Sequence, residues 1–107
     1  MKVLFPGKVE GTADYGGNVK IMVSKSTGSQ LNSGIFSLKP GERLVDDIHE
    51  SDEVFYIVRG TLTVDSPGLD GINAREGEIV LIPAGQLHIS SNKGDSEVEV
   101  FWCNIEK

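Results

Sequence analysis

The sequence of 107 residues is poor in cysteine, in histidine and in long apolar runs. Its one cysteine, Cys103, excludes an intrachain disulfide and is typical of a protein from a reducing compartment. No apolar run approaches the roughly 20 residues that a membrane helix needs. Near the start of the chain, Pro6 interrupts the apolar residues of 3–5, which are too few for a secretory signal. We therefore expect a cytoplasmic protein.

The sequence is also short of positive charge. Acidic residues outnumber basic ones by 16 to 10, which gives a formal net charge of -6. Such a chain is repelled by phosphate backbones and by anionic membrane surfaces. We therefore expect neither nucleic acid nor membrane as a partner, and a small-molecule substrate or ligand instead.

Glycine and proline are frequent enough to divide the chain into short segments. Thirteen glycines and four prolines separate apolar and β-branched stretches at the spacing that is typical of strands and tight turns. No window of 11 or more residues shows a helical period. We predict one all-β domain over residues 1–107, a barrel or jelly-roll sandwich. The predicted strands are 3–5, 19–24, 34–38, 53–58, 61–64, 72–74, 79–82, 88–90 and 98–104, and residues 26–33 are predicted to form a loop.

The two histidines of the chain lie in two spaced motifs. The first contains Gly41, Asp47, His49, Glu53 and Gly60, and the second contains Gly77, Pro83, Gly85, His88 and Asn92. These motifs resemble the two conserved motifs of the cupin family. The resemblance implies a cupin-type double-stranded β-helix, which is a jelly-roll barrel.

The resemblance also implies a metal site. Family membership implies four metal ligands, which fall on Asp47, His49, Glu53 and His88. Asp47 departs from the family pattern, because a histidine usually stands at that position. The implied cofactor is a divalent transition metal, with Fe or Mn expected first and Zn or Ni also compatible. Small cupins usually dimerise through their sheets, so a homodimer is expected as well.

The same residues suggest chemistry without reference to any family. Residues two apart in an extended segment point to one face, so Asp47 and His49 can converge, and Glu53 and His88 can approach from neighbouring strands. Imidazole and carboxylate together suit Fe, Mn, Ni, Zn or Cu. Asp47 can be a fourth ligand, or a general base beside a triad of the other three residues. A third alternative is acid and base catalysis without a metal.

Other residues have simpler interpretations. The acidic residues Asp46, Glu50 and Asp52 are expected in a solvated loop, and the motif glycines are expected to serve turns. Phe55 and Ile57 share the face of Glu53 and are expected to line the interior. Packing in the core or in an interface is favoured over a role as pocket walls for Phe36, Tyr56 and Trp102. Asn92 is expected to cap a turn, and Cys103 is expected to be inert.

Three classes of function are compatible with these patterns. The first is a metal-dependent enzyme acting on a small organic molecule, such as a dioxygenase. The second is a non-redox isomerase, epimerase, lyase or cyclase that uses Asp47, Glu53 and His88 as acid and base groups. The third is a module that binds a sugar or another small molecule without chemistry. For an enzyme, the predicted catalytic residues are Asp47 and Glu53.

Overall fold

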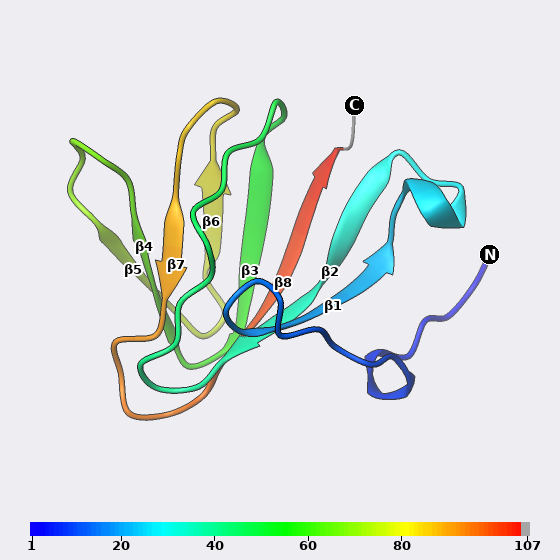
Figure 1. Ribbon diagram of the computed structural model, residues 1–107, viewed down its shortest axis with the longest axis horizontal. Helices are drawn as coiled ribbons and strands as arrows, with labels where there is room; N and C mark the ends of the chain where they lie inside the picture. Colours follow the sequence, from blue (N-terminus) through cyan, green and yellow to red (C-terminus); the bar gives the residue numbers. More distant parts are fainter. Residues whose placement is uncertain (106–107) are drawn as a thin grey trace.

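The computed structural model describes residues 1–105, which form eight strands in two sheets (Figure 1). The five-stranded sheet has the order β1-β2-β8-β3-β6, and the three-stranded sheet has the order β5-β4-β7. All paired strands are antiparallel. The strands are β1 (Asn18–Val23), β2 (Leu31–Leu38), β3 (Glu53–Arg59), β4 (Thr61–Asp65), β5 (Ile72–Arg75), β6 (Ile79–Ile82), β7 (Ile89–Ser91) and β8 (Val98–Ile105). This all-β jelly-roll barrel confirms the predicted fold class.

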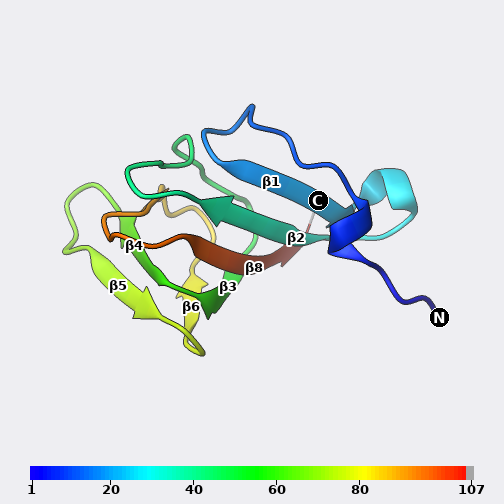
Figure 2. The same ribbon diagram turned by 90° about the horizontal axis from the view of Figure 1, so that it is seen from below.

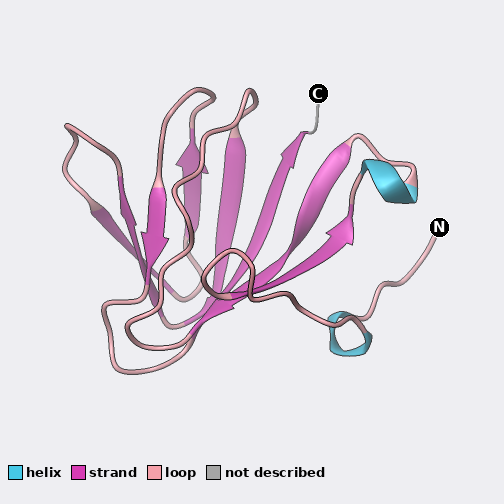
Figure 3. Cartoon of the chain, in the orientation of Figure 1, coloured by secondary structure: helices cyan, strands magenta, loops and turns pink. Residues whose placement is uncertain are grey.

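In the described part of the chain, helical structure is confined to two short turns at the edge of the molecule (Figure 3). They are 3-10 turns, η1 (Pro6–Lys8) and η2 (Lys25–Thr27), and neither contains a buried residue. Within residues 1–105, no helix has the length and apolarity needed to cross a membrane.

Two predictions at the start of the chain are wrong. Residues 3–5 are not a strand, because they pair with no other segment of the described chain and their apolar side chains are exposed. Residues 31–33 belong to β2 and not to a loop. They are ordered because β8 is long enough to pair along the whole of β2, from Leu38 opposite Val98 to Leu31 opposite Ile105.

The interior changes from apolar to polar along the barrel. At one end Val98, Val100 and Ile57 are completely buried. Burying an aliphatic side chain of this size contributes about 1.5–3 kcal/mol. Further along β8 and β3, the inward positions become Trp102 beside Phe55, and then Asn104 beside Glu53. The predicted inward direction of Phe55 and Ile57 is confirmed, and along β3 and β8 the polar inward residues Glu53 and Asn104 lie together at one end of the barrel.

The outer face of the five-stranded sheet is unusually apolar. Tyr56 on β3 is opposite Ile79 on β6 and Phe101 on β8, and Val54 is opposite Leu81 in the next row. All five side chains are at least one third exposed. We call these five residues the outer patch, and it places Tyr56 outside the barrel.

The segment between β2 and β3, residues 39–52, joins two strands of the five-stranded sheet and crosses the front of the molecule (Figure 1). Its backbone is hydrogen-bonded to the segment around β7: Leu44 N–H donates to Ser90 O, and Asn92 N–H donates to Glu42 O. The view from below shows β1, β2 and β8 side by side beneath it (Figure 2). One side of the barrel is thus closed by an irregular segment and not by a regular strand.

Two motif residues have the structural roles that the sequence predicted. Gly60 joins β3 to β4 with φ of 81°, and a Cβ there would lie 2.7 Å from the Glu97 carbonyl oxygen. Asn92 is 2% exposed, and its side-chain amide donates to Leu38 O and Ser96 O while its Oδ1 accepts from Gly94 N–H. These residues stabilise the fold at the end opposite the polar interior.

Candidate metal centre

The two histidine motifs are joined through their backbones. Asp47 N–H donates to His88 O over 3.0 Å, and His88 N–H donates to Asp47 O over 2.9 Å. Gly85 N–H donates to His49 O, and Ala84 N–H donates to the Asp52 carboxylate. Asp52, which the sequence assigned to a solvated loop, therefore also anchors that loop. These hydrogen bonds hold the two motifs next to each other without the help of a metal.

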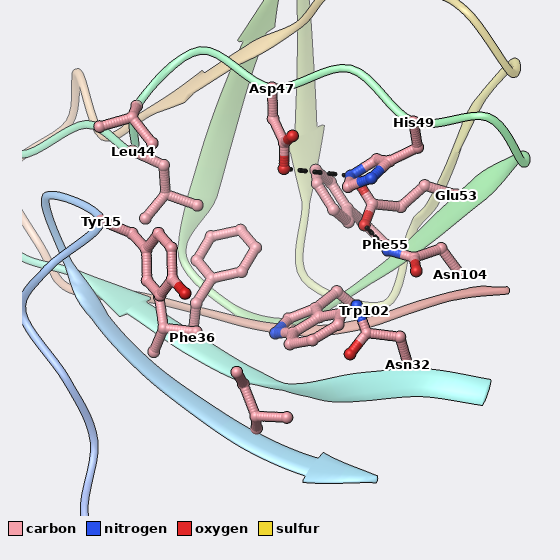
Figure 4. Close-up of a pocket in the computed structure, with 13 residues that line it drawn as sticks. Tyr15, Asn32, Phe36, Leu44, Asp47, His49, Glu53, Phe55, Trp102 and Asn104 are labelled. Carbon is pink, nitrogen blue, oxygen red and sulfur yellow. Dashed lines mark hydrogen bonds and ion pairs between the residues drawn. The ribbon is translucent and has the colours of Figure 1, made fainter. Parts of the chain in front are cut away.

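The four predicted ligands converge at the polar end of the barrel (Figure 4 shows Asp47, His49 and Glu53). His49 Nε2 lies 3.1 Å from Asp47 Oδ2 and 3.3 Å from Glu53 Oε1, and His88 Nε2 lies 3.1 Å from the same Glu53 oxygen. The donor atoms of Asp47, His49 and His88 all lie within 4.8 Å of one another. The convergence predicted from the sequence is thus present in the structure.

Burial distinguishes the four side chains. Glu53 and His88 have side chains 6% and 4% exposed, His49 is 24% exposed, and Asp47 is 54% exposed. Asp47 Oδ1 accepts from Ile48 N–H, which leaves Oδ2 to face the imidazole of His49. Three groups are therefore held inside the barrel, while Asp47 remains accessible at its rim.

His88 is oriented by a bond to the backbone. Its Nδ1 lies 3.1 Å from the Gln86 carbonyl oxygen, and donation of Nδ1–H to that oxygen leaves the Nε2 lone pair directed at the centre. Burial of His88 disfavours its protonated form, but contacts with Glu53 and Gln86 and the charge of Asp47 outweigh burial and raise its pKa above 6.5. The negative charge around His88 thus favours its protonated form in the metal-free protein.

His49 provides a test of whether a metal fits. Its Nε2 is buried and makes no hydrogen bond, although two carboxylate oxygens lie within 3.3 Å. A buried polar atom without a partner is costly, by about 1–3 kcal/mol. A cation among two imidazoles and two carboxylates would satisfy this nitrogen and neutralise the carboxylates. The donor set therefore fits a divalent transition metal.

A cavity of about 200 Å³ opens beside these residues. Its walls include the aromatic side chains of Tyr15, Phe36, Phe55 and Trp102, and Asn32 and Asn104 supply amide groups (Figure 4). Phe36 and Trp102 were predicted as core or interface residues. They are core residues, 2% and 8% exposed, and they also form the cavity wall.

Three residues of the site were missed in the sequence. Tyr15 comes from the loop that precedes β1, while Asn32 and Asn104 come from β2 and β8. Asn104 donates a 2.7 Å hydrogen bond to Glu53 Oε2, and Asn32 is opposite Asn104 in the sheet. An alternation of inward positions along 98–104 could have placed Asn104 on the side of Trp102, but not beside Glu53.

The family model described as "Cupin domain" matches residues 34–104. The chain is 28% identical over 98 residues to "Polyketide synthase CurC" of Streptomyces cyaneus, covering 89% of this chain and 63% of that protein. It is 31% identical over 92 residues to "Protein SchB" of Streptomyces halstedii, covering 81% of this chain and 64% of that protein. The chain thus spans less than two thirds of the length of either relative.

Solved structures share the fold. The polyketide cyclase RemF from Streptomyces resistomycificus superimposes with a TM-score of 0.85. The alignment covers 100% of this chain and 80% of that chain at 16% sequence identity. At that identity the likeness shows a common barrel only.

Proposed function

Because the chain belongs to the cupin family, we propose that it is a metal-dependent enzyme that rearranges a small, oxygenated organic molecule by proton transfer, as a cyclase does. The observation that carries this proposal is the approach of His49 Nε2 and His88 Nε2 to Glu53 Oε1, at 3.3 Å and 3.1 Å, with Asp47 beside them at an aromatic-walled cavity. The likeness to CurC, named a polyketide synthase, supports the same direction.

In this proposal, His49, His88 and Glu53 hold the metal and Asp47 is the base. The first three are the more buried groups. The side chains of His88 and Glu53 are hydrogen-bonded to Gln86 O and Asn104, and the backbone of His49 accepts from Gly85 N–H. Asp47 is the most exposed of the four and lies at the cavity, where a substrate proton can reach it. The metal would polarise a substrate carbonyl group as a Lewis acid.

The substrate class follows from the cavity walls. Four aromatic side chains offer flat apolar surfaces, and two amides and two carboxylates offer polar contacts. A volume of about 200 Å³ accommodates one or two rings, or one part of a longer molecule. A planar molecule that carries keto or hydroxyl groups satisfies both kinds of wall.

The proposed reaction is redox-neutral. A carbon next to a carbonyl group loses its proton to Asp47, and the resulting enolate carbon attacks a second carbonyl carbon of the same molecule. A carbon–carbon bond forms, and the new alkoxide oxygen takes the proton from Asp47. Loss of water then gives a conjugated ring. Apolar walls such as Phe36 and Trp102 would exclude competing water.

A dioxygenase is the second candidate function. The observation that favours it is the two-histidine, one-carboxylate set formed by His49, His88 and Glu53, which is typical of non-haem iron oxygenases. The two candidates differ in their need for oxygen, because proton transfer proceeds under anaerobic conditions and a dioxygenase reaction does not.

The test measures proton exchange between a ketone and the solvent. Protein loaded with Mn²⁺, Fe²⁺ or Zn²⁺ is incubated with phenylacetone in D₂O without oxygen, and exchange at the benzylic carbon is followed by ¹H NMR. We expect faster exchange with the wild type than with Asp47→Asn at equal metal content. Oxygen consumption on an electrode, together with no exchange, would instead support the dioxygenase.

We also propose that the protein is a homodimer that buries the outer patch. Five exposed apolar side chains in two adjacent rows are more than a monomer usually presents on one flat face. Burying such a face between two copies is the common solution in symmetric dimers.

A further inference from the structure

Asn104 gives the two oxygens of one carboxylate different surroundings. Its Nδ2 donates to Glu53 Oε2 over 2.7 Å, and the two residues are 5% and 4% exposed. The other oxygen, Oε1, faces the imidazoles of His49 and His88 at 3.3 Å and 3.1 Å. The hydrogen bond from Asn104 therefore holds Oε2, while Oε1 is directed at the candidate metal centre.

We infer that Asn104 is a positioning residue that restricts Glu53 to one metal-facing oxygen. The inference rests on the proposed metal centre, in which Glu53 is a ligand. A carboxylate can bind a metal through one oxygen or through both. With Oε2 held by Asn104, only Oε1 would be free to bind the metal. One more coordination position would then stay open for the substrate.

The backbone keeps Asn104 in this role. Asn104 on β8 is directly opposite Glu53 on β3 in the sheet. Just beyond this pair, Ser51 Oγ donates to Ile105 O over 2.9 Å and accepts from Ile105 N–H over 3.1 Å. These bonds fix the end of β8 against the start of β3. The backbone of Asn104 is therefore held beside Glu53.

The residue type also fits the role. An amide nitrogen donates a hydrogen bond to a buried carboxylate without adding a charge, so the negative charge of Glu53 remains available to a metal. An aspartate at this position has no N–H to donate and would place a like charge against Glu53. Asn104 thus supplies a hydrogen bond to Glu53 Oε2 without adding a charge beside it.

Asn32 provides a matched control. It is opposite Asn104 on the neighbouring strand β2 and lines the same cavity. Among residues 1–105, its side chain makes no hydrogen bond to any of the four converging side chains. Replacing Asn32 changes the cavity wall and leaves Glu53 and its partner intact.

The test uses Co²⁺ as the probe. Wild type, Asn104→Leu, Asn104→Ser and Asn32→Leu are purified without metal, and Co²⁺ binding is measured by calorimetry and by visible absorption. Leucine removes the donor at similar volume, and the serine hydroxyl ends short of Glu53. We expect both Asn104 variants to lose about 10- to 100-fold in affinity, the usual effect of removing a partner of a metal ligand. Their visible bands should change in intensity, and Asn32→Leu should retain both properties.

Three results would overturn the inference. A folded Asn104→Ser protein with wild-type affinity and spectrum would show that Glu53 needs no such partner. An equal change in Asn32→Leu would assign the effect to the cavity wall. A wild type that binds no Co²⁺ would overturn the metal centre itself. The first two results are distinguishable from this third result, because both require a wild type that binds Co²⁺. Circular dichroism identifies any variant that fails to fold. If one Asn104 variant fails to fold, the Co²⁺ affinity and spectrum of the other test the inference.

Discussion

Glu53 Oε1 and His88 Nε2 lie 3.1 Å apart, although Glu53 begins β3 in the five-stranded sheet and His88 directly precedes β7 in the three-stranded sheet. This contact joins the two sheets at the polar end of the barrel. Because both side chains are almost completely buried, their mutual position depends on how the sheets pack. A ligand that binds both groups would therefore hold the sheets together.

Removing either imidazole should abolish metal binding. We expect wild-type protein, purified without chelator or nickel resin, to carry about one transition-metal ion per chain. His49→Ala and His88→Ala should carry almost none by elemental analysis, because two of the required donors are imidazoles. Asp46→Ala is the control, since that carboxylate is exposed and pairs with Arg43. Full metal content in both histidine variants would contradict the proposed centre.

The role of Asp47 can be separated from that of the ligands. If Asp47 is the base, Asp47→Asn and Asp47→Ala keep their metal and lose proton exchange, by about 10²- to 10⁴-fold for a lost general base. Metal content by elemental analysis and exchange by NMR are measured on the same preparation. Metal loss in Asp47→Ala would make Asp47 a ligand, as the shared 4.8 Å cluster also allows.

The stability of the metal-free protein should depend on His88. Burial disfavours its protonated form, but Glu53, Gln86 and Asp47 outweigh burial and raise its pKa above 6.5. The folded state then keeps a proton that the unfolded chain releases. This stabilisation is fully present below about pH 6.5 and is lost as the pH rises through the raised pKa. We expect the melting temperature of metal-free wild type to fall over that range, and His88→Gln to lack this component of the decline.

Asn92 should be important for stability and not for chemistry. Its side chain bonds Leu38 O, Ser96 O and Gly94 N–H in a buried position. Asn92→Ala leaves buried groups without partners, which costs about 1–3 kcal/mol for each group. Urea unfolding should show a loss of that order, with metal affinity unchanged in the folded protein. Lys93→Ala is the neighbouring control, because its exposed pair with Asp65 contributes little.

A charge in the outer patch should separate the proposed dimer. Leu81 is 62% exposed on β6, and Leu81→Glu would bury a carboxylate against apolar side chains in a dimer interface. We expect a dimer for wild type and a monomer for this variant in sedimentation at micromolar concentration. Ile72→Glu is the matched control, since Ile72 is 48% exposed on β5 of the other sheet. Monomeric wild type would contradict the proposal.

The convergence of the four candidate ligands could be predicted because it depends on local spacing and on two recognisable motifs. Asp47 and His49 are two residues apart, and the turn residues of the second motif bring His88 to the same end. The glycine turns were predicted for the same reason: Gly41, Gly60, Gly77 and Gly85 all have positive φ. Local spacing thus predicts the pair Asp47 and His49 and the glycine turns, while the approach of Glu53 and His88 was implied by the resemblance of the two motifs.

Asn104 could not be predicted, because its role depends on register between strands far apart in sequence. Its bond to Glu53 spans 51 residues, and a shift of β8 by one residue would turn Asn104 outward. The same long-range pairing explains why residues 31–33 are a strand despite their polar composition. Residues 3–5 show the converse, because apolar side chains without a partner strand do not form one.

The position of β8 in the sheet order also affects the time course of synthesis. β8 lies between β2 and β3, although it follows both in the chain. On a ribosome that adds about 5–20 residues per second, β3 waits several seconds for the strand that joins it to β2. Until then the nascent chain exposes the edges of β2 and β3 and lacks the partner of Glu53. Chaperone binding to such intermediates should therefore end only when β8 has emerged.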